Sequence, residues 1–294
     1  MTNEFRLGGD VPINRLGFGA MRLPQGGWNG PPRDPETGRA VLRRAVDLGV
    51  NHIDTAEFYR SNNGAVRANV LIREALHPYP RGLIIATKVG PVFGPNGSSE
   101  APAADLRALV EGNLKTLGLD RLDLVYLRMG SRMGVPHGAS LGERFEALAR
   151  LREEGLIRHL ALSNVDAAHL AEARAIAPVA AVQNNFNIAK RDDAAVLDTC
   201  AKSGIAFVPF GPMGSGHTDL NDDRIAKVAA RHDATVSQIA LAWLLTVSPV
   251  TLAIPGTGSV AHLEENVRAG SISLTANDLA ELALTASSRE NTHA

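Results

Sequence analysis

The stretch ETGRAVLRRAVDLGVNHID, residues 36–54, contains the unit from which we predict the fold. Its first part is an amphipathic helical pattern that ends at Gly49, a usual helix stop. A short strand, His52–Asp54, follows and finishes on a carboxylate. An amphipathic stretch followed by a short apolar run is the pattern that recurs along the chain.

Eight strands are predicted in this way, at residues 15–19, 52–54, 83–87, 122–127, 159–162, 181–183, 206–209 and 252–254. The predicted helices cover residues 36–49, 65–76, 103–118, 141–155, 165–177, 192–204, 223–233, 235–247, 259–270 and 276–286. Strands that alternate with helices at this chain length favour a (β/α)8 TIM barrel. No linker or change of composition divides the chain, so we expect one domain over residues 1–294.

A doubly wound open sheet is the alternative, because it also alternates strands and helices. Its dinucleotide-binding fingerprint, G-x-G-x-x-G, would lie between an early strand and a helix. Gly17 and Gly19 match its first two glycines, but Arg22 stands at the third position and a loop follows. The barrel is therefore the favoured fold.

Composition limits the classes of function. The chain has 294 residues, of which 45% are hydrophobic and 21% charged, as in a globular protein with a sizeable core. A net charge of -1 offers no field for nucleic acid or an anionic membrane, so neither is an expected partner. The longest apolar run, residues 239–245, is too short to span a bilayer.

Cysteine and histidine usage adds two expectations. Cys200 is the only cysteine, so we predict a buried core residue, no intrachain disulfide and a reducing, cytoplasmic location. The first ten residues lack the apolar core of a signal peptide, in agreement with a cytoplasmic protein. The nine histidines are scattered without metal-ligand spacing, so no metal site is predicted.

Chemistry in a parallel barrel gathers at the C-terminal ends of the strands. The polar and aromatic residues at the predicted strand ends are Asp54, Lys88, Arg128, Ser163 with Asn164, Gln183 and Phe210. We expect them around one mouth.

Asp54, Tyr59 and Lys88 form a candidate proton-transfer group. A phenol has a pKa of about 10, and a cation about 4 Å away favours its ionised form. Lys88 would lower the pKa of Tyr59, Asp54 would orient Lys88, and Tyr59 would serve as a general acid. The alternative is structural: Asp54 caps a turn, Lys88 pairs with it and Tyr59 packs.

These residues lie in segments that resemble the aldo-keto reductases, which are NAD(P)H-dependent carbonyl reductases built on this barrel. The resembling segments are RLGFGAMRLP, NHIDTAEFY, ATKVG, HLALSNV, VQNNFN, VPFGPMGSG and IPGTGSVAHLEENV. The resemblance covers nearly the whole chain. It implies that Tyr59 is the proton donor, Lys88 its activator and Asp54 the partner of Lys88.

The resemblance also implies a cofactor site. Ser163, Asn164 and Gln183 would bind the nicotinamide carboxamide, and Phe210 would stack on its ring. The remaining implied cofactor contacts are Gly19, Ala20 and Met21 beside the cofactor, Gly211, Pro212, Met213, Gly214, Ser215 and Gly216 around the pyrophosphate, and Glu265 and Asn266 at the adenine. A plain glycine-rich turn is the alternative for residues 211–216.

The segment implied to hold the 2′-phosphate departs from the family pattern. It contains Gly256, Thr257, Ser259 and His262, whereas family members often place Lys or Arg there. A neutral His is a weaker phosphate anchor than Arg. We therefore expect NADPH to be the cofactor, with NADH possible.

A second departure concerns Arg128. The family pattern D-x-x-x-x-H, counted from Asp123, puts Arg128 where the usual catalytic His stands. A guanidinium has several donors and a fixed charge, so Arg128 is expected to bond the carbonyl oxygen and help lower the pKa of Tyr59. The alternative is a structural ion pair with Asp54 or Glu57.

The predicted substrate is a small carbonyl compound in a mouth framed by the loops after residues 19, 88 and 128. Its implied contacts are Trp28, Phe58, Phe93 and Met129, although Trp28 and Phe93 are as well explained by packing under loops. The sequence predicts an NADPH-dependent carbonyl reductase. A nucleotide-sensing or partner-binding protein with weak turnover and a specialist pyridoxal- or sugar-type reductase stay open. So does the oligomeric state, with which a monomer is compatible.

Overall fold

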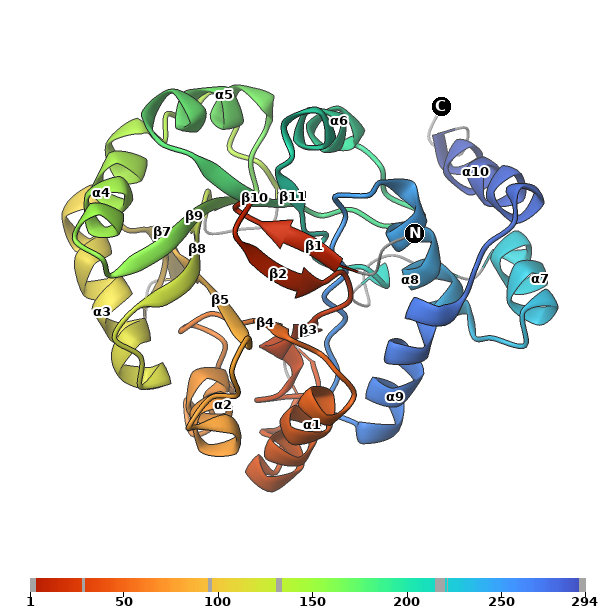
Figure 1. Ribbon diagram of the computed structural model, residues 1–294, viewed down its shortest axis with the longest axis horizontal. Helices are drawn as coiled ribbons and strands as arrows, with labels where there is room; N and C mark the ends of the chain where they lie inside the picture. The colour runs from red at the N-terminus through yellow and green to blue at the C-terminus, as the bar shows by residue number, and fades with distance from the viewer. Residues whose placement is uncertain are drawn as a thin grey trace.

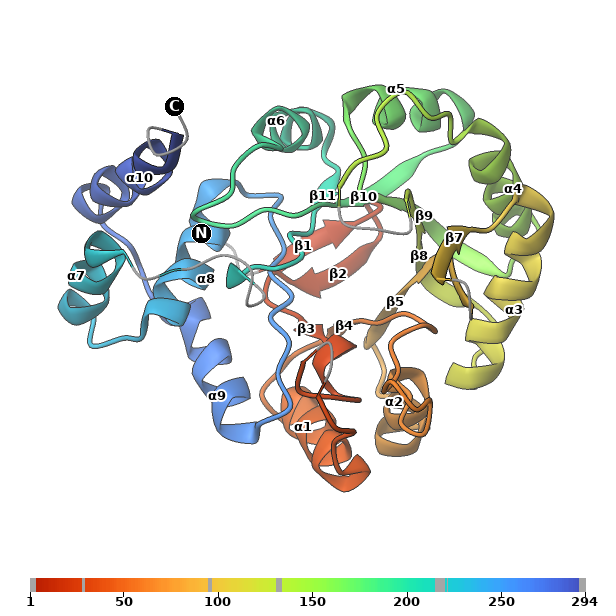
Figure 2. The same ribbon diagram turned by 180° about the vertical axis from the view of Figure 1, so that it is seen from behind.

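A curved sheet of parallel strands, surrounded by helices, forms the centre of the molecule (Figures 1 and 2). The computed structural model describes residues 4–27, 30–94, 97–130, 134–214, 220 and 222–290. The strand order in the sheet is β11-β10-β9-β8-β5-β4-β3. These strands are β3 (Phe18–Gly19), β4 (His52–Asp54), β5 (Ile84–Val89), β8 (Leu122–Arg128), β9 (Ile157–Ser163), β10 (Val179–Gln183) and β11 (Ala206–Phe207).

Residues 251–253 close the sheet into a barrel. Thr251 forms a parallel bridge with Phe207, and Ala253 forms one with Leu16. Backbone bonds of 2.8 Å join Leu252 N to Phe207 O and Gly17 N to Ala253 O. The strands predicted at 15–19, 206–209 and 252–254 are therefore shorter than expected, with isolated bridges in part of their length. The predicted (β/α)8 barrel is confirmed.

A buried arginine holds this closure in place. Arg15 is 5% exposed, and its guanidinium donates to the backbone oxygens of Leu245, Ser248 and Thr251 at 2.6, 2.6 and 3.1 Å. Two of these oxygens lie at the end of helix α8 (Val236–Val247), where the helix itself offers no donor. Arg15 thus fastens the first strand to the last helix–strand connection.

Each predicted helix forms. They are α1 (Pro35–Asp47), α2 (Ala68–Leu76), α3 (Leu106–Leu117), α4 (Gly142–Glu153), α5 (Ala167–Ile176), α6 (Ala194–Ser203), α7 (Asp223–Arg231), α8 (Val236–Val247), α9 (Val260–Arg268) and α10 (Ala276–Glu290). α1 begins where Asp34 accepts a bond from Thr37 N at 3.0 Å and Pro35 takes the first turn. Cys200 is buried in α6, as predicted.

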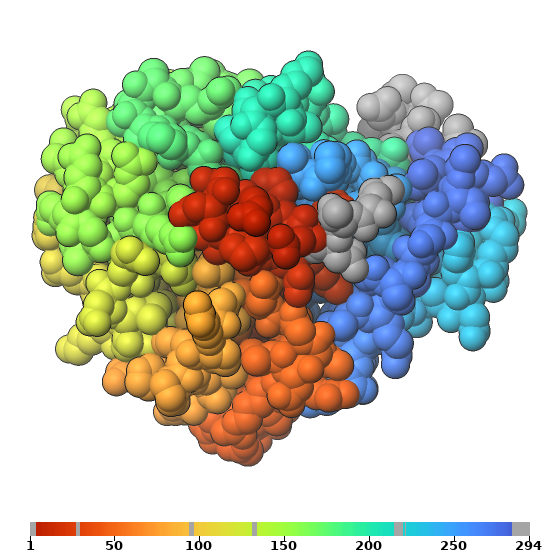
Figure 3. Space-filling model, in the orientation of Figure 1, coloured from red at the N-terminus to blue at the C-terminus, as the bar shows by residue number. Residues whose placement is uncertain are grey.

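An antiparallel hairpin, which the sequence analysis missed, covers one end of the barrel (Figures 1 and 3). β1 (Glu4–Leu7) and β2 (Val11–Asn14) pair across Gly8 and Gly9, both at positive φ. Leu7, Val11 and Ile13 pack with the apolar side chains inside the barrel. The signal was a Gly-Gly turn between two short alternating runs. The functional mouth therefore lies at the opposite end.

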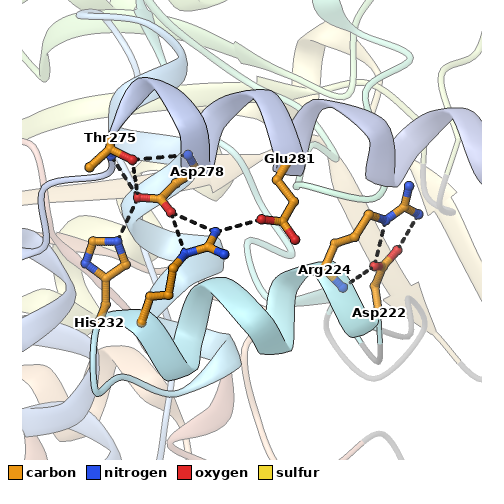
Figure 4. A network of polar contacts seen from close by, with 7 residues as sticks. Asp222, Arg224, His232, Thr275, Asp278 and Glu281 are labelled. Carbon is orange, nitrogen blue, oxygen red and sulfur yellow. Dashed lines mark hydrogen bonds and ion pairs between the residues drawn. The ribbon is translucent and has the colours of Figure 1, made fainter.

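The C-terminal helix is held to α7 by a network of charged side chains (Figure 4). Asp278 accepts bonds from His232 Nε2 at 2.9 Å, from Arg231 Nη2 at 2.8 Å and from Thr275 Oγ1 at 2.7 Å. Burial alone would raise the pKa of Asp278, but these bonds hold it well below its ordinary value. Asp222 and Arg224 form a second ion pair at the start of α7.

Candidate active site

The residues predicted at the strand ends form two groups of contacts at the end of the barrel opposite the hairpin. Lys88 Nζ lies 2.5 Å from Asp54 Oδ1, and Gln183 Nε2 donates to Asp54 Oδ2 at 2.8 Å. Arg128 Nη1 donates to Ser163 Oγ at 3.3 Å. The Arg128 guanidinium also lies 5.3 Å from the centre of the Phe210 ring. Strands β4, β5, β8, β9 and β10 position these side chains, as the barrel fold predicts.

Lys88 is a buried, charged ammonium. Its Nζ donates to Thr55 O at 3.1 Å as well as to Asp54, and its side chain is 2% exposed. Burial alone would lower the pKa of Lys88, but Asp54 and Tyr59 together raise it above its ordinary value. A fixed positive charge therefore stands in the site at neutral pH.

Tyr59 lies against this charge. Lys88 Nζ is 5.0 Å from the centre of the Tyr59 ring. Part of the ring surface is exposed, yet burial is the largest influence on the pKa of Tyr59 and raises it above its ordinary value. Lys88 and, more weakly, Arg128 act in the opposite direction. Lys88 therefore lowers the pKa of Tyr59, as predicted, but burial outweighs it and the pKa lies above its ordinary value.

Arg128 forms no ion pair with Asp54 or Glu57, the two carboxylates of the structural alternative. Asp54 pairs with Lys88, and Glu57 pairs with Arg67 at 2.5 Å, so both carboxylates of the alternative ion pair are bound to other cations. Burial lowers the pKa of Arg128 below its ordinary value, although Tyr59 and Asp54 each act to raise it. The guanidinium has enough margin to stay charged.

A cleft of about 420 Å³ extends from this group to the segment before α9. Of the predicted site residues it is lined by Gly19, Met21, Asp54, Tyr59, Gln183, Phe210, Gly211, Pro212, Met213, Gly256 and Thr257. It is also lined by Arg22, Gly26, Arg33, Ile254 and Gly258, which the sequence analysis did not assign to the site. Arg22 follows the predicted Gly19–Met21 stretch directly. No sequence signal marks Arg33, because it reaches the cleft through a contact between the two ends of the chain.

Two glycines shape this cleft. A Cβ on Gly19 would come 2.7 Å from Ile254 O, and one on Gly256 would come 2.6 Å from Gly19 O. Only glycines let the first and last strand ends approach so closely. The wall is therefore bare backbone flanked by arginines, an arrangement that fits the phosphates of a dinucleotide.

Several predicted cofactor residues have structural partners instead of lining the cleft. Ala20 is fully buried. Asn164, at φ 61, donates to Met129 O at 2.7 Å and to Gly134 O at 2.6 Å. Ser259 caps α9, and Glu265 accepts a bond from Thr235 Oγ1 at 2.6 Å.

The other predicted cofactor residues differ in exposure. His262 is exposed on the first turn of α9, and Asn266 is 4% exposed. Gly214 directly follows Met213, the last residue of its loop that lines the cleft. Ser215 and Gly216 lie outside the described residues.

Aromatic side chains lie on the substrate side of Tyr59. The Phe58 ring centre is 5.3 Å from that of Tyr59 and 5.4 Å from that of Phe93. Phe93 is 46% exposed on the hairpin of β6 (Pro91–Gly94) and β7 (Gly97–Glu100), which forms most of the loop predicted after Lys88. A pocket of about 120 Å³ lies between Phe58, Lys88 and Phe93.

Met129 does not lie in this pocket. Its side chain is fully buried, and its Sδ is 2.9 Å from Arg144 Nη2. The chain turns this side chain inward after β8, so the structure does not place Met129 beside Phe58 and Phe93. Trp28 lies outside the described residues.

A model of the Aldo/keto reductase family matches residues 15–285. The chain belongs to the aldo/keto reductase family. It is therefore an NAD(P)H-dependent oxidoreductase, as the sequence predicted. Pyridoxine 4-dehydrogenase of Escherichia coli (strain K12) is 47% identical over 287 residues, which are 96% of this chain and 97% of that protein. An uncharacterized oxidoreductase of Schizosaccharomyces pombe is 41% identical, over 93% of this chain and 87% of its own.

Solved structures of aldo-keto reductases superpose on this one. A thermostable aldo-keto reductase in complex with the inhibitor epalrestat gives a TM-score of 0.81 at 30% identity, covering 97% of this chain and 100% of that chain. An aldo/keto reductase from Klebsiella pneumoniae in complex with NADP and acetate gives 0.78 at 26% identity, covering 96% and 94%.

In the part of the chain that the structure describes, no three His, Cys, Asp or Glu side chains form a group able to hold a metal ion. No helix in the same part of the chain is long and apolar enough to cross a membrane.

Proposed function

We propose that this protein is an NADPH-dependent reductase of aromatic aldehydes of the pyridoxal type, and that it oxidises the corresponding alcohol in reverse. The chemical step rests on one observation: Tyr59 lies beside a buried ammonium that Asp54 keeps charged at 2.5 Å. The substrate class rests on the pair formed by Phe58 and Phe93 and on the likeness to pyridoxine 4-dehydrogenase.

Tyr59 supplies the proton. Its raised pKa keeps the phenol protonated at neutral pH, so it is ready to donate to a carbonyl oxygen. When bound, the reduced nicotinamide supplies a hydride to the carbonyl carbon. The charges of Lys88 and Arg128 then stabilise the Tyr59 oxygen until solvent returns its proton. In alcohol oxidation the ionised Tyr59 accepts the hydroxyl proton.

Arg128 orients the carbonyl oxygen from the end of β8. Ser163 holds the guanidinium at 3.3 Å, and the Phe210 ring lies under it at 5.3 Å. A guanidinium held in this way offers donors where negative charge develops on oxygen. Because it does not lose its proton near neutral pH, proton transfer falls to Tyr59 alone.

The test is a substrate panel for the purified protein with NADPH, containing pyridoxal, benzaldehyde and open-chain sugar aldehydes, and pyridoxine with NADP+ in reverse. We expect kcat/KM to be highest for pyridoxal. A preference for sugar aldehydes would contradict the substrate class. Tight NADPH binding with no turnover of any aldehyde would favour the nucleotide-sensing alternative.

A further inference from the structure

Arg33 occupies a built position beside the segment that precedes α9. The loop between β3 and α1 folds back on itself, with Arg33 N bonded to Pro24 O at 2.9 Å and a bridge between Gln25 and Pro32. Arg33 Nε donates to Arg22 O at 3.0 Å. The loop therefore presents the guanidinium in a fixed direction.

The guanidinium lies directly on Gly258. A Cβ at Gly258 would come 2.5 Å from Arg33 Nε and 2.6 Å from Cζ, and one at Gly26 would come 3.2 Å from Nη2. Both glycines line the same cleft as Arg33. The absence of a side chain at Gly258 is thus what admits the arginine to the cleft.

Arg33 differs from the arginines of the adjacent helix. Arg39 pairs with Glu36 at 2.9 Å, Arg43 pairs with the same glutamate at 3.0 Å, and Arg44 pairs with Glu264 at 2.8 Å. Within the described residues, Arg33 forms no ion pair, and the Arg22 carbonyl is the partner of its guanidinium. A half-buried guanidinium without a carboxylate partner is open to an anionic ligand.

The surroundings favour a phosphate at this place. Thr257 and Gly258 lead into the N-terminus of α9, which Ser259 caps, and helix N-termini attract anions. The carboxylate of Glu265 is bonded to Thr235. Gly256, Thr257 and Gly258 line the cleft directly before α9, so a phosphate here would lie at the α9 side of the cleft that Tyr59 also lines.

We propose that Arg33 binds the 2′-phosphate of NADPH and sets the preference for NADPH over NADH. The cation that the segment around Gly256 and His262 lacks is supplied across the cleft by the loop after the first strand. A guanidinium binds a phosphate through two parallel bonds, which suits a terminal phosphate group. This inference rests on the NADPH dependence in the proposed function.

The test measures nucleotide binding without turnover. We expect Arg33→Met to raise the Kd for NADPH, followed by fluorescence, by about 10- to 100-fold, as for the loss of a charge-assisted bond. The Kd for NADH should change by less than about threefold, since it lacks the 2′-phosphate. In calorimetric titrations, 2′,5′-ADP should lose affinity whereas 5′-AMP should not.

Two further variants keep the proposal open to contradiction if Arg33→Met folds poorly. Gly258→Ala places a methyl group where the guanidinium lies, so it should weaken NADPH selectively with Arg33 still present. Arg33→Lys should retain part of the selectivity as a point charge. Arg43→Met, on the outer face of α1, is the matched control and should leave both affinities unchanged.

Two outcomes overturn the proposal. Equal losses for NADPH and NADH would place Arg33 on the pyrophosphate, and unchanged affinities would remove it from the nucleotide site. Failure of the carbonyl-reductase proposal would differ from both. In that case the wild-type protein would turn over none of the aldehydes while these affinities still separated the two nucleotides.

Discussion

Lys88 Nζ and Asp54 Oδ1 lie 2.5 Å apart, with side chains 2% and 5% exposed. Such a pair is strongly coupled, because removing one partner leaves the other charge buried and uncompensated. Asp54→Asn is expected to lower the free energy of unfolding by about 3–5 kcal/mol. The double variant Asp54→Asn/Lys88→Met should recover much of this loss. Urea unfolding of the wild type, both single variants and the double variant measures the coupling, and additive losses would contradict it.

Tyr59→Phe tests the proton donor. The change removes one hydroxyl from a ring that packs against Phe58, so the fold should be preserved. Reduction should fall by orders of magnitude because the proton is supplied only in the transition state. NADPH affinity should stay nearly constant, as followed by fluorescence titration. Activity within about tenfold of the wild type, on the scale of general acid catalysis, would exclude Tyr59 as the donor.

The raised pKa of Tyr59 predicts opposite pH dependences for the two directions. Aldehyde reduction needs the phenol, so its rate should be level through neutral pH and fall only in the alkaline range. Alcohol oxidation needs the ionised form, so its rate should increase as pH rises toward that pKa. Steady-state profiles of kcat/KM for pyridoxal and pyridoxine test this. If the reduction rate instead begins to decline with rising pH already below pH 7, burial does not dominate the pKa of Tyr59.

The sequence was sufficient for the main architecture. Each predicted helix formed. Polar residues were also predicted to gather at the strand ends, and in the structure Lys88 and Gln183 both bond to Asp54 there. The periodic signals of helices such as α1 are local, so they can be recognised without the tertiary structure.

What the sequence did not reveal depends on contacts distant in the chain. A strand was predicted at residues 252–254, but the bridges by which Thr251 and Ala253 reach Phe207 and Leu16 and close the barrel join segments far apart in the chain. Arg33 reaches the cleft because it meets Gly258 across the barrel closure. The effect of burial on Tyr59 likewise depends on how densely other segments surround it.

His52 gives a prediction for acid stability. It is 5% exposed, and neither ring nitrogen has a hydrogen-bond partner among the described residues. A Cβ on Gly17 would come 2.2 Å from the ring, so only a glycine fits beside it. Burial lowers the pKa of His52 to about 4, although Asp54 opposes this.

The different pKa of His52 in the folded and unfolded states makes the stability of the protein depend on pH. In the unfolded chain His52 takes up its proton near pH 6.5, whereas in the folded protein it does so near pH 4. The contribution of neutral His52 to the free energy of unfolding is therefore fully present above about pH 6.5. It is lost as pH falls toward 4, and the whole loss is about 3 kcal/mol. His52→Leu should weaken this dependence in urea unfolding at pH 7 and pH 4.5. Equal pH dependence in both proteins would contradict the assignment.

Arg128 gives the last prediction. If it binds the carbonyl oxygen, Arg128→Met should lower kcat and kcat/KM together, by about two to three decades, because the interaction strengthens as negative charge develops. Ser163→Ala tests the support of the guanidinium separately from its charge. It removes the bond of 3.3 Å to Arg128 but leaves the guanidinium charge, so its effect should be much smaller.

The pH profile separates this catalytic role from a structural one. Arg128 is one of the cations that lower the pKa of Tyr59, so Arg128→Met should move the alkaline limb of the profiles to higher pH. Arg128→His replaces the guanidinium by another side chain with N–H donors and should recover part of the rate if the pocket orients an imidazole. A purely structural Arg128 predicts a different pattern, with lower stability but normal kinetics in the folded enzyme. A destabilised Arg128→Met variant with unchanged kcat and an unshifted profile would therefore exclude Arg128 from catalysis.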